Sequence, residues 1–352
     1  MTDLQPFLTK LISIAGLSGY EKPVSKLIEE AWTPLTDERK TSRLGSLHGL
    51  RRGSAPEPRP SILISAHMDA IGLMVTGLAE GFLHVTGIGG LDPRILPGQL
   101  VTIHGRQDLA GVVIQPPGHL LPNHLQEGVV PIEYLLVDTG RLSSEVERLV
   151  RVGDLVSYAQ PALSMEGDTL AGHSLDNRAS VAALTGCLEA LQSRPHAWDV
   201  WAVASVQEEV TLGGAATSAF QLHPSLAVAL DVTFATSPGS PGHRTYPLGK
   251  GPVLGWGPNI HPVLFRDFKE LAERLEIPHA VEVMPRHSGT DAFAMQVATE
   301  GIPCMVVSIP LRYMHTPVEM VSMKDITRAG RLLAEFIAAL DVNYLEKVTW
   351  ED

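Results

Sequence analysis

Glu208 and Glu209 are adjacent acidic residues that follow an apolar segment of the chain. Two neighbouring glutamates are unusual at such a position. At about 4 Å and an effective dielectric constant of about 20, two carboxylates repel each other by on the order of 4 kcal/mol. A bound cation would offset this repulsion. His67 and Asp69 directly follow another apolar segment, so side chains able to bind metal recur at these ends.

Three further side chains of the same types are placed in a similar way. Asp231 follows the apolar run at 225–230, and His315 lies a few residues beyond the run at 304–309. Asp176 opens a helical pattern, where it could also serve as an N-cap. Because ligands of open α/β sheets bind outside the carboxyl ends of the strands, we expect these side chains to converge there. Imidazole and carboxylate donors suit zinc, cobalt or manganese.

The number of carboxylates points to two divalent cations. Asp176, Glu209 and Asp231 together carry three negative charges against four positive ones, and a bound hydroxide would complete the balance. Two metal ions about 3.5–4 Å apart need a bridging carboxylate, and Asp176 is the predicted bridge. In an extended segment Asp69 faces the same side as His67. We therefore expect its carboxylate to accept a hydrogen bond from the ring nitrogen of His67 that does not bind metal, and so to fix the tautomer of this histidine in the catalytic site.

Glu208 and Glu209 are expected to have different roles. In an extended chain they point in opposite directions, so one can bind metal while the other reaches the bound water. We assign Glu209 to metal and Glu208 to the general base, since zinc can lower the pKa of bound water to about 7. The alternative is that the two glutamates are an ordinary, solvent-exposed strand end. The apolar run before the pair and the glycines after it favour a metal site instead.

Apolar segments of strand length alternate with helical patterns along the chain. The four apolar runs are nearly continuous, as in strands covered on both faces, and lie at 61–66, 200–206, 225–230 and 304–309. The helical patterns lie at 176–192, 261–276 and 322–342. This alternation predicts an α/β fold with a mixed, mostly parallel sheet sandwiched by helices.

Residues 73–165 have a different pattern, in which short β-like segments are separated by glycine and proline. They predict a small β-barrel or PDZ-like domain inserted into the α/β domain. The predicted catalytic domain is therefore made of 1–72 and 166–352, and the insert of 73–165.

Composition excludes several classes of function. The 352-residue chain has a formal net charge of −12 and 44% hydrophobic residues. An acidic chain is a poor candidate for binding nucleic acid or anionic lipid, and no apolar stretch is long enough to span a bilayer. The two cysteines, Cys187 and Cys304, lie in apolar segments and form no disulfide framework. We therefore expect a cytoplasmic protein.

Six segments, taken together, resemble the tetrahedral-aminopeptidase (TET) family, which includes glutamyl and deblocking aminopeptidases. They occur in family order as SAHMDAIG, SLDNRASVAAL, SVQEEVTLGGA, LDVT, HSGTDAFAMQ and IPLRYMHTPVEMV. The similarity covers nearly the whole chain. It implies a dinuclear-metal exopeptidase whose inserted domain mediates dimerisation and whose subunits often assemble into a hollow tetrahedral dodecamer.

The resemblance also implies a ligand set for each metal ion. The first ion would be held by His67, Asp176 and Asp231. The second would be held by Asp176, Glu209 and His315. A cis peptide bond after Asp176 is implied as well.

The loop at 288–291 departs from the family pattern. Family members commonly have Gly-Gly-Thr-Asp where this chain has Ser-Gly-Thr-Asp. Thr290 and Asp291 are predicted to bind the substrate amine or to shape the specificity pocket. Arg286 and Arg312 lie near the motifs. They could favour substrates with an acidic side chain, or they could have surface or structural roles.

The prediction is a metal-dependent aminopeptidase that acts on peptides with a free N-terminus, with Glu208 as general base. A related carboxypeptidase or amide deacylase is the alternative within the same chemistry. A metal-binding scaffold without activity is the alternative outside it, and it would be expected to lack a ligand or the base. A glycosidase is disfavoured, because nothing indicates two carboxylates that flank a sugar.

Overall fold

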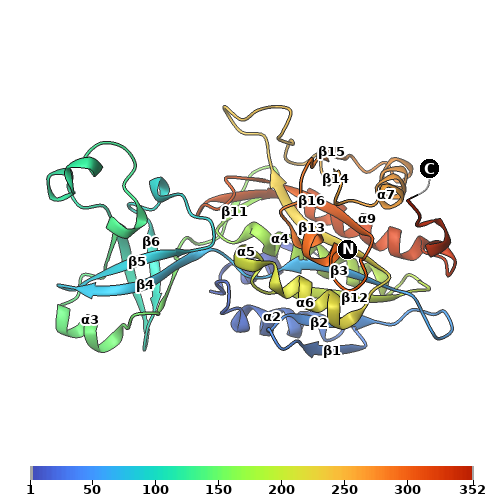
Figure 1. Ribbon diagram of the computed structural model, residues 1–352, viewed down its shortest axis with the longest axis horizontal. Helices are drawn as coiled ribbons and strands as arrows, with labels where there is room; N and C mark the ends of the chain where they lie inside the picture. The colour runs from blue at the N-terminus through green and yellow to red at the C-terminus, as the bar shows by residue number, and fades with distance from the viewer. Residues whose placement is uncertain (1–2, 351–352) are drawn as a thin grey trace.

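The computed structural model describes residues 3–350, which form a large α/β body and a β-barrel that projects from one end of it (Figure 1). The body is built on an 11-stranded sheet with the strand order β1-β2-β12-β3-β13-β16-β17-β11-β10, and β14 and β15 are attached beside β16. The strands of this sheet are β1 (Glu38–Thr41), β2 (Leu47–Arg51), β3 (Ser61–His67), β10 (Leu163–Met165), β11 (Thr169–Gly172), β12 (Asp199–Ser205), β13 (Leu226–Phe234), β14 (Val253–Trp256), β15 (Ala280–Val283), β16 (Cys304–Arg312) and β17 (Glu319–Ser322).

The four predicted apolar runs form the centre of this sheet. Strands β12, β3, β13 and β16 lie side by side and parallel, and their residues are almost completely buried. The strands outside this centre pair antiparallel, apart from the parallel pair β14 and β15. The predicted fold class, a mixed and mostly parallel sheet with helices on both sides, is confirmed.

Helices cover both faces of the sheet. The long helix α4 packs with α1, α2 and α9 on one face, and α7 packs on α9; the short helices α6 and α8 pack together on the other face. A side chain at Gly330 would collide with the α4 backbone, because its Cβ would lie 2.5 Å from the carbonyl oxygen of Ala183. The helices of the body are α1 (Gln5–Ile12), α2 (Lys22–Trp32), α4 (Leu175–Leu191), α5 (Glu208–Thr211), α6 (Gly213–Leu222), α7 (Pro262–Arg274), α8 (Asp291–Gln296) and α9 (Met323–Ala339).

The insert is a closed antiparallel barrel with the strand order β4-β5-β8-β7-β6-β9 and its own hydrophobic core. Its elements are β4 (Gly72–Ala79), β5 (Phe82–Ile88), β6 (Leu100–His104), β7 (Asp108–Ile114), β8 (Leu136–Asp138), α3 (Ser143–Leu149) and β9 (Leu155–Tyr158). Strand β10 falls within the range 73–165 that the sequence assigned to the insert, but it pairs with β11 in the large sheet. The division of the chain into two domains stays a prediction.

Two other findings bear on the sequence-based expectations. Cys187 and Cys304 are both buried and free. Within residues 3–350, each helix is too short or too polar to cross a lipid bilayer.

Candidate metal centre

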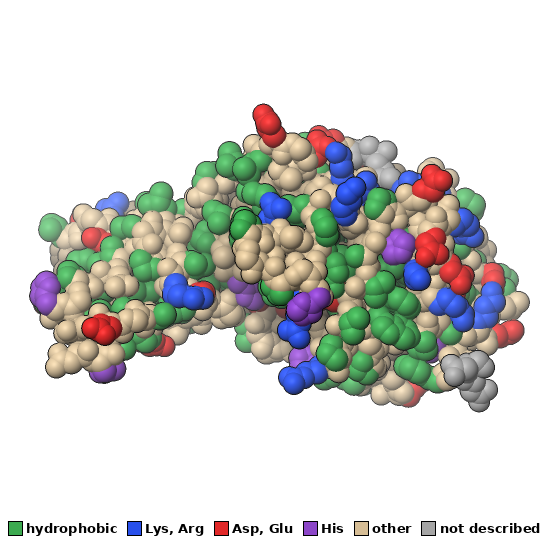
Figure 2. Space-filling model, turned by 90° about the horizontal axis from the view of Figure 1, so that it is seen from above, with side chains coloured by type: hydrophobic (Ala, Val, Ile, Leu, Met, Phe, Trp, Pro, Cys, Tyr) green, Lys and Arg blue, Asp and Glu red, His purple; other side chains and the backbone are tan. Residues whose placement is uncertain are grey.

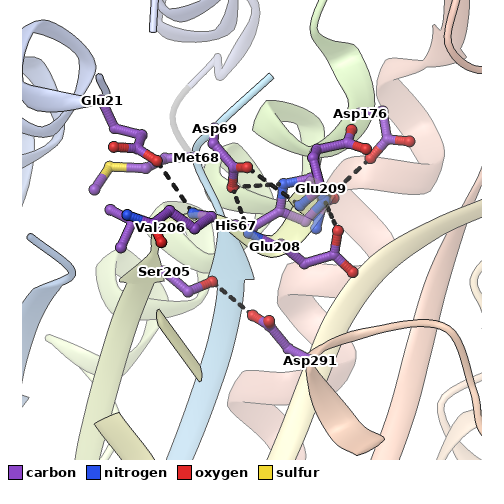
Figure 3. Close-up of polar contacts among 12 residues, drawn as sticks. Glu21, His67, Met68, Asp69, Asp176, Ser205, Val206, Glu208, Glu209 and Asp291 are labelled. Carbon is purple, nitrogen blue, oxygen red and sulfur yellow. Dashed lines mark hydrogen bonds and ion pairs between the residues drawn. The ribbon is translucent and has the colours of Figure 1, made fainter. Parts of the chain in front are cut away.

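The predicted metal ligands converge at the carboxyl ends of the parallel strands. His67 Nε2 lies 3.2 Å from Asp176 Oδ1 and 3.8 Å from Asp231 Oδ1. On the other side, His315 Nε2 lies 3.4 Å from Asp176 Oδ2 and 3.4 Å from Glu209 Oε2. Asp176 therefore faces one histidine with each of its carboxylate oxygens. Figure 3 shows His67, Asp176 and Glu209 close together.

These side chains, together with Glu208, are called the metal cluster below. Donor atoms of His67, Asp176 and Glu209 lie within 4.8 Å of one another, and so do those of His67, Glu208 and Asp231. Among residues 3–350, no lysine or arginine forms an ion pair with these carboxylates. Carboxylates and imidazoles at a largely buried place, without a neighbouring cationic side chain, fit a site for divalent metal ions.

The pKa values of the metal cluster show how strongly its acids need a positive charge. Burial raises the pKa of Glu208 to about 10, with His67 opposing the shift. Burial and the charge of Asp176 raise the pKa of Glu209 to about 7. The hydrogen bond with Asp176 raises the pKa of His315 to about 9, although burial lowers it. Metal ions would replace these protons as the source of positive charge.

Asp176 owes its position to an irregular start of α4. Burial would raise its pKa, but the hydrogen bonds with His315 and His67 lower it below the ordinary value, so it is the most acidic group of the cluster. Its φ and ψ of −77° and 104° are not helical, so the regular part of α4 begins after it. The peptide bond between Asp176 and Asn177 is cis, which confirms what the family resemblance implied.

The two glutamates lie in a tight helical turn, which corrects the expectation of an extended chain. Gln207 has φ +56°, a left-handed backbone conformation. At this residue the chain turns away from β12 and enters α5. The Asp69 carboxylate accepts hydrogen bonds from the backbone N–H groups of Glu208 and Glu209, at 3.1 and 3.2 Å (Figure 3). An acceptor at the start of a helical turn is favourable, because the first N–H groups have no partner within the helix.

Asp69 is less well placed for its predicted bond to His67. Its Oδ1 lies 3.4 Å from His67 Nδ1, beyond the usual range of about 2.7–3.2 Å for an N–H···O bond. The firm contacts of Asp69 are therefore those to the turn that carries Glu208 and Glu209.

Glu319 is a supporting residue that the sequence analysis missed. Its side chain is buried, and its two oxygens accept the backbone N–H groups of Asp176, at 3.0 Å, and of His315, at 2.8 Å. It thus joins two cluster residues that are far apart in the chain. The available signal was a single acid within the otherwise apolar segment VEMV at the end of the last motif.

The barrel also reaches the metal cluster, which the sequence analysis did not predict. The backbone carbonyl of Gly90, in the loop after β5, lies 2.8 Å from His315 Nδ1. Nδ1–H donates to this carbonyl, so Nε2 is left free to bind metal. A Cβ at Gly90 would lie 3.1 Å from the same nitrogen, so the contact leaves little room for a side chain.

Comparison with known proteins assigns the family. Residues 45–332 match the family described as M42 glutamyl aminopeptidase. The chain belongs to the M42 aminopeptidase family. It is a hydrolase that acts on peptide bonds, and its family works with divalent metal ions.

Relatives of this M42 family member span nearly its whole length. It is 36% identical to the lysyl aminopeptidase of Pyrococcus furiosus, over 95% of this chain and 96% of the relative. It superposes on a TET aminopeptidase from a marine-sediment Thaumarchaeota archaeon with a TM-score of 0.93, at 30% identity, over 98% of this chain and 99% of that one. For the TET1 peptidase of Pyrococcus horikoshii the TM-score is 0.83, at 29% identity, over 96% and 100% of the two chains.

In this M42 family member a cavity of about 520 Å³ opens onto the metal cluster, and Thr290 lines it. Asp291 does not line it. Its carboxylate is buried and accepts hydrogen bonds from the Ser65 and Ser205 hydroxyls, both at 2.6 Å. Figure 3 shows the contact with Ser205. The contact of Thr290 and Asp291 with the substrate stays a prediction, and the Asp291 carboxylate connects β3 with the end of β12. A larger cavity of about 1040 Å³ lies beside α2 and has no cluster residue in its lining.

Proposed function

We propose that this chain is a dinuclear metallo-aminopeptidase that removes the N-terminal residue of peptides, with Glu208 as the general base. The observation that carries the proposal is the position of Asp176 between two histidines, with one oxygen toward each. A carboxylate that faces two ligand sets is what a pair of metal ions about 3.5–4 Å apart requires.

The two ligand sets are assigned from these contacts. One ion would be held by His67, Asp176 and Asp231, and the other by Asp176, Glu209 and His315. Zinc or cobalt suits these donors best, and manganese also accepts them. When bound, the ions would polarise the scissile carbonyl and lower the pKa of the attacking water.

Glu208 is assigned the proton transfers. It lines the cavity, and its Oε2 lies 3.7 Å from His67 Nε2. Its carboxylate is therefore beside the proposed ligands and open to the cavity. It would take a proton from the water and pass it to the leaving nitrogen. Cations in the two ligand sets would lower its raised pKa, and a base works best when its pKa is near the working pH. Asp69 would hold the turn that carries it, and Thr290 would contact the substrate.

The test combines a metal count with an activity assay. The protein, stripped with a chelator and reloaded with zinc or cobalt, should bind two ions per chain and cleave an aminoacyl anilide only after reloading. One ion per chain would contradict the dinuclear site. Two ions without cleavage would favour a scaffold. Release of C-terminal residues, or cleavage of N-acetylated peptides, would favour a carboxypeptidase or an amide deacylase.

We also propose that the chain self-associates, into dimers and into a tetrahedral dodecamer, with the barrel as a contact surface. The TET1 peptidase of Pyrococcus horikoshii can assemble into a tetrahedron or a large octahedral shell. Large hydrophobic side chains are exposed on the barrel, among them Leu100, Leu120 and Leu142, and Figure 2 shows hydrophobic groups on the narrower lobe. A cytoplasmic location, without nucleic-acid or membrane partners, stays a prediction from composition.

A further inference from the structure

Glu21 is a buried acid that contacts the turn carrying Glu208 and Glu209 without lining the active-site cavity. It directly precedes α2, and its Oε1 accepts the backbone N–H of Gln207 at 3.1 Å. The same oxygen accepts the N–H of Gly19 at 2.6 Å, which fixes the side chain in place. Glu21 lines the larger cavity beside α2 instead. Its contact with the turn is therefore separate from the cavity that opens onto the metal cluster.

The turn presents three successive backbone N–H groups to two carboxylates. The N–H of Gln207 donates to Glu21, whereas those of Glu208 and Glu209 donate to Asp69. Successive N–H groups in a left-handed and a right-handed residue form a concave site that attracts negative charge, and Gln207 followed by the first residue of α5 has this geometry. In this chain two of the protein's own carboxylates fill the concave site.

The left-handed conformation of Gln207 needs support from its surroundings. This conformation is unfavourable for a residue with a Cβ, so it persists only where contacts outside the turn hold it. The supporting acid is itself unfavourable to bury. Burial raises the pKa of Glu21, and the nearby Asp69 charge raises it further, although the N–H groups that Glu21 accepts lower it. A buried carboxylate at this position indicates a role beyond packing.

The loop before α2 is fixed to the segment that follows β3. The N–H of Ala70 donates to the carbonyl oxygen of Gly16, and the N–H of Ser18 donates to that of Ala70, both at 3.1 Å. The buried Arg178 guanidinium donates to a carbonyl oxygen of each segment, those of Gly16 and Met68, at 3.3 Å each. The two acids that hold the turn therefore belong to one connected pair of loops.

We propose that Glu21 is a positioning residue for the general base: it holds Gln207 in the left-handed conformation and thereby sets where the Glu208 carboxylate lies relative to the attacking water. This inference rests on the proposed function, in which Glu208 is the base. Glu21 belongs to neither ligand set and does not line the active-site cavity. Its loss should therefore lower kcat while KM and the metal content stay nearly unchanged.

The test measures kcat, KM and the metal count of the full-length, metal-loaded variants on an aminoacyl p-nitroanilide. Glu21→Ala should lower kcat by about 10- to 100-fold, as a misplacement of a reacting group by roughly 1 Å does. Glu21→Gln keeps an oxygen that can accept both N–H groups, so it should retain most of the activity. If Glu21→Ala keeps the wild-type kcat, or if Glu21→Gln loses as much as Glu21→Ala, the positioning role is wrong.

The matched control is Thr185→Val, which removes a buried hydrogen bond of 2.9 Å from the Trp32 indole of α2. It should lower the Tm, as Glu21→Ala does, and leave kcat unchanged. An equal loss of kcat in this control would show that activity simply follows the stability of α2, and would overturn the inference.

A double-mutant cycle connects the effect to the base. In the Glu208→Gln background, Glu21→Ala should cause almost no further loss of kcat, because the group that it positions is already gone. An equal loss in both backgrounds would show that Glu21 acts on another group, and the inference would be overturned although the enzyme is an aminopeptidase. Near-normal kcat of Glu208→Gln alone would contradict the proposed base, and no cleavage by the wild type with two metals bound would contradict the proposed function. In either case this inference fails with it.

Discussion

Glu208 and Glu209 are neighbours in the chain, yet their carboxylates contact different partners, His67 and His315 respectively. Their substitution should therefore have different effects. We expect Glu208→Gln to keep both metal ions and to lower kcat by about 10²–10⁴-fold, the usual contribution of a general base. Metal analysis and steady-state kinetics on the same preparation check this. Near-normal turnover in the fully loaded variant would show that another group accepts the proton.

Titration of the metal cluster gives a second prediction at this scale. The pKa values of Glu209, about 7, and Glu208, about 10, are raised mainly by burial, and the pKa of His315 is raised to about 9 by Asp176. All three groups hold more protons when folded than in the unfolded chain, where the pKa values are about 4.3 and 6.5. Stability of the chelated protein should therefore fall as the pH rises from about 5 to 9.

Thermal denaturation of the chelated protein across this pH range measures the effect. The metal-loaded protein is the control and should change less, because bound metal has already displaced these protons. A Tm of the chelated protein that stays level or rises toward pH 9 would contradict the prediction.

At the level of single residues, the sequence predicted the proposed metal ligands better than the residues that hold those ligands in place. His67, Glu209 and Asp231 could be found because each follows a run of apolar residues directly or closely. Glu319 could not, since its importance depends on contacts with segments far away in the chain. A pattern along the sequence does not contain such contacts.

At the scale of elements, the central strands and the long helices were predictable because burial on both faces leaves continuous apolar runs. The local backbone at the metal cluster was not. The left-handed Gln207 and the non-helical start of α4 are stabilised by surrounding contacts, such as that of Glu319 with the N–H of Asp176. Local sequence preference alone predicted an extended Glu208–Glu209 pair and an ordinary helix start at Asp176.

The loop after β5 provides a prediction at this scale. We expect Gly90→Ala to displace the His315 ring, because the added Cβ would lie 3.1 Å from Nδ1. Affinity for one of the two metal ions should fall by about 10–100-fold, as it does when the hydrogen-bond partner of a metal-bound histidine is lost. Metal titration of the stripped protein measures this.

The matched control for this loop is Gly118→Ala, in the barrel, where a Cβ would meet nothing within 4 Å and the backbone requires no positive φ. It should keep both affinities. Equal loss of both ions in Gly90→Ala would point to damage of the whole site instead of His315.

For the whole molecule, the proposed assembly predicts a particle mass of about twelve times the 37.9 kDa chain. Light scattering at working concentration checks this. The double variant Leu100→Lys/Leu142→Lys places charges at exposed apolar positions of the barrel and should lower the mass without changing the secondary structure. A wild-type protein that stays monomeric or dimeric would contradict the dodecamer, and an unchanged mass of the variant would place the contacts elsewhere.

The hydrogen bond between Gly90 and His315 joins the barrel to the chemistry of the body. If neighbouring subunits hold the barrel in one orientation, they also hold that imidazole ring in place. Thermodynamic linkage then works in both directions: a chain that leaves the particle should lose zinc more readily, and a chain that has lost zinc should leave the particle more readily. Dilution and chelation would become two routes to the same inactive subunit.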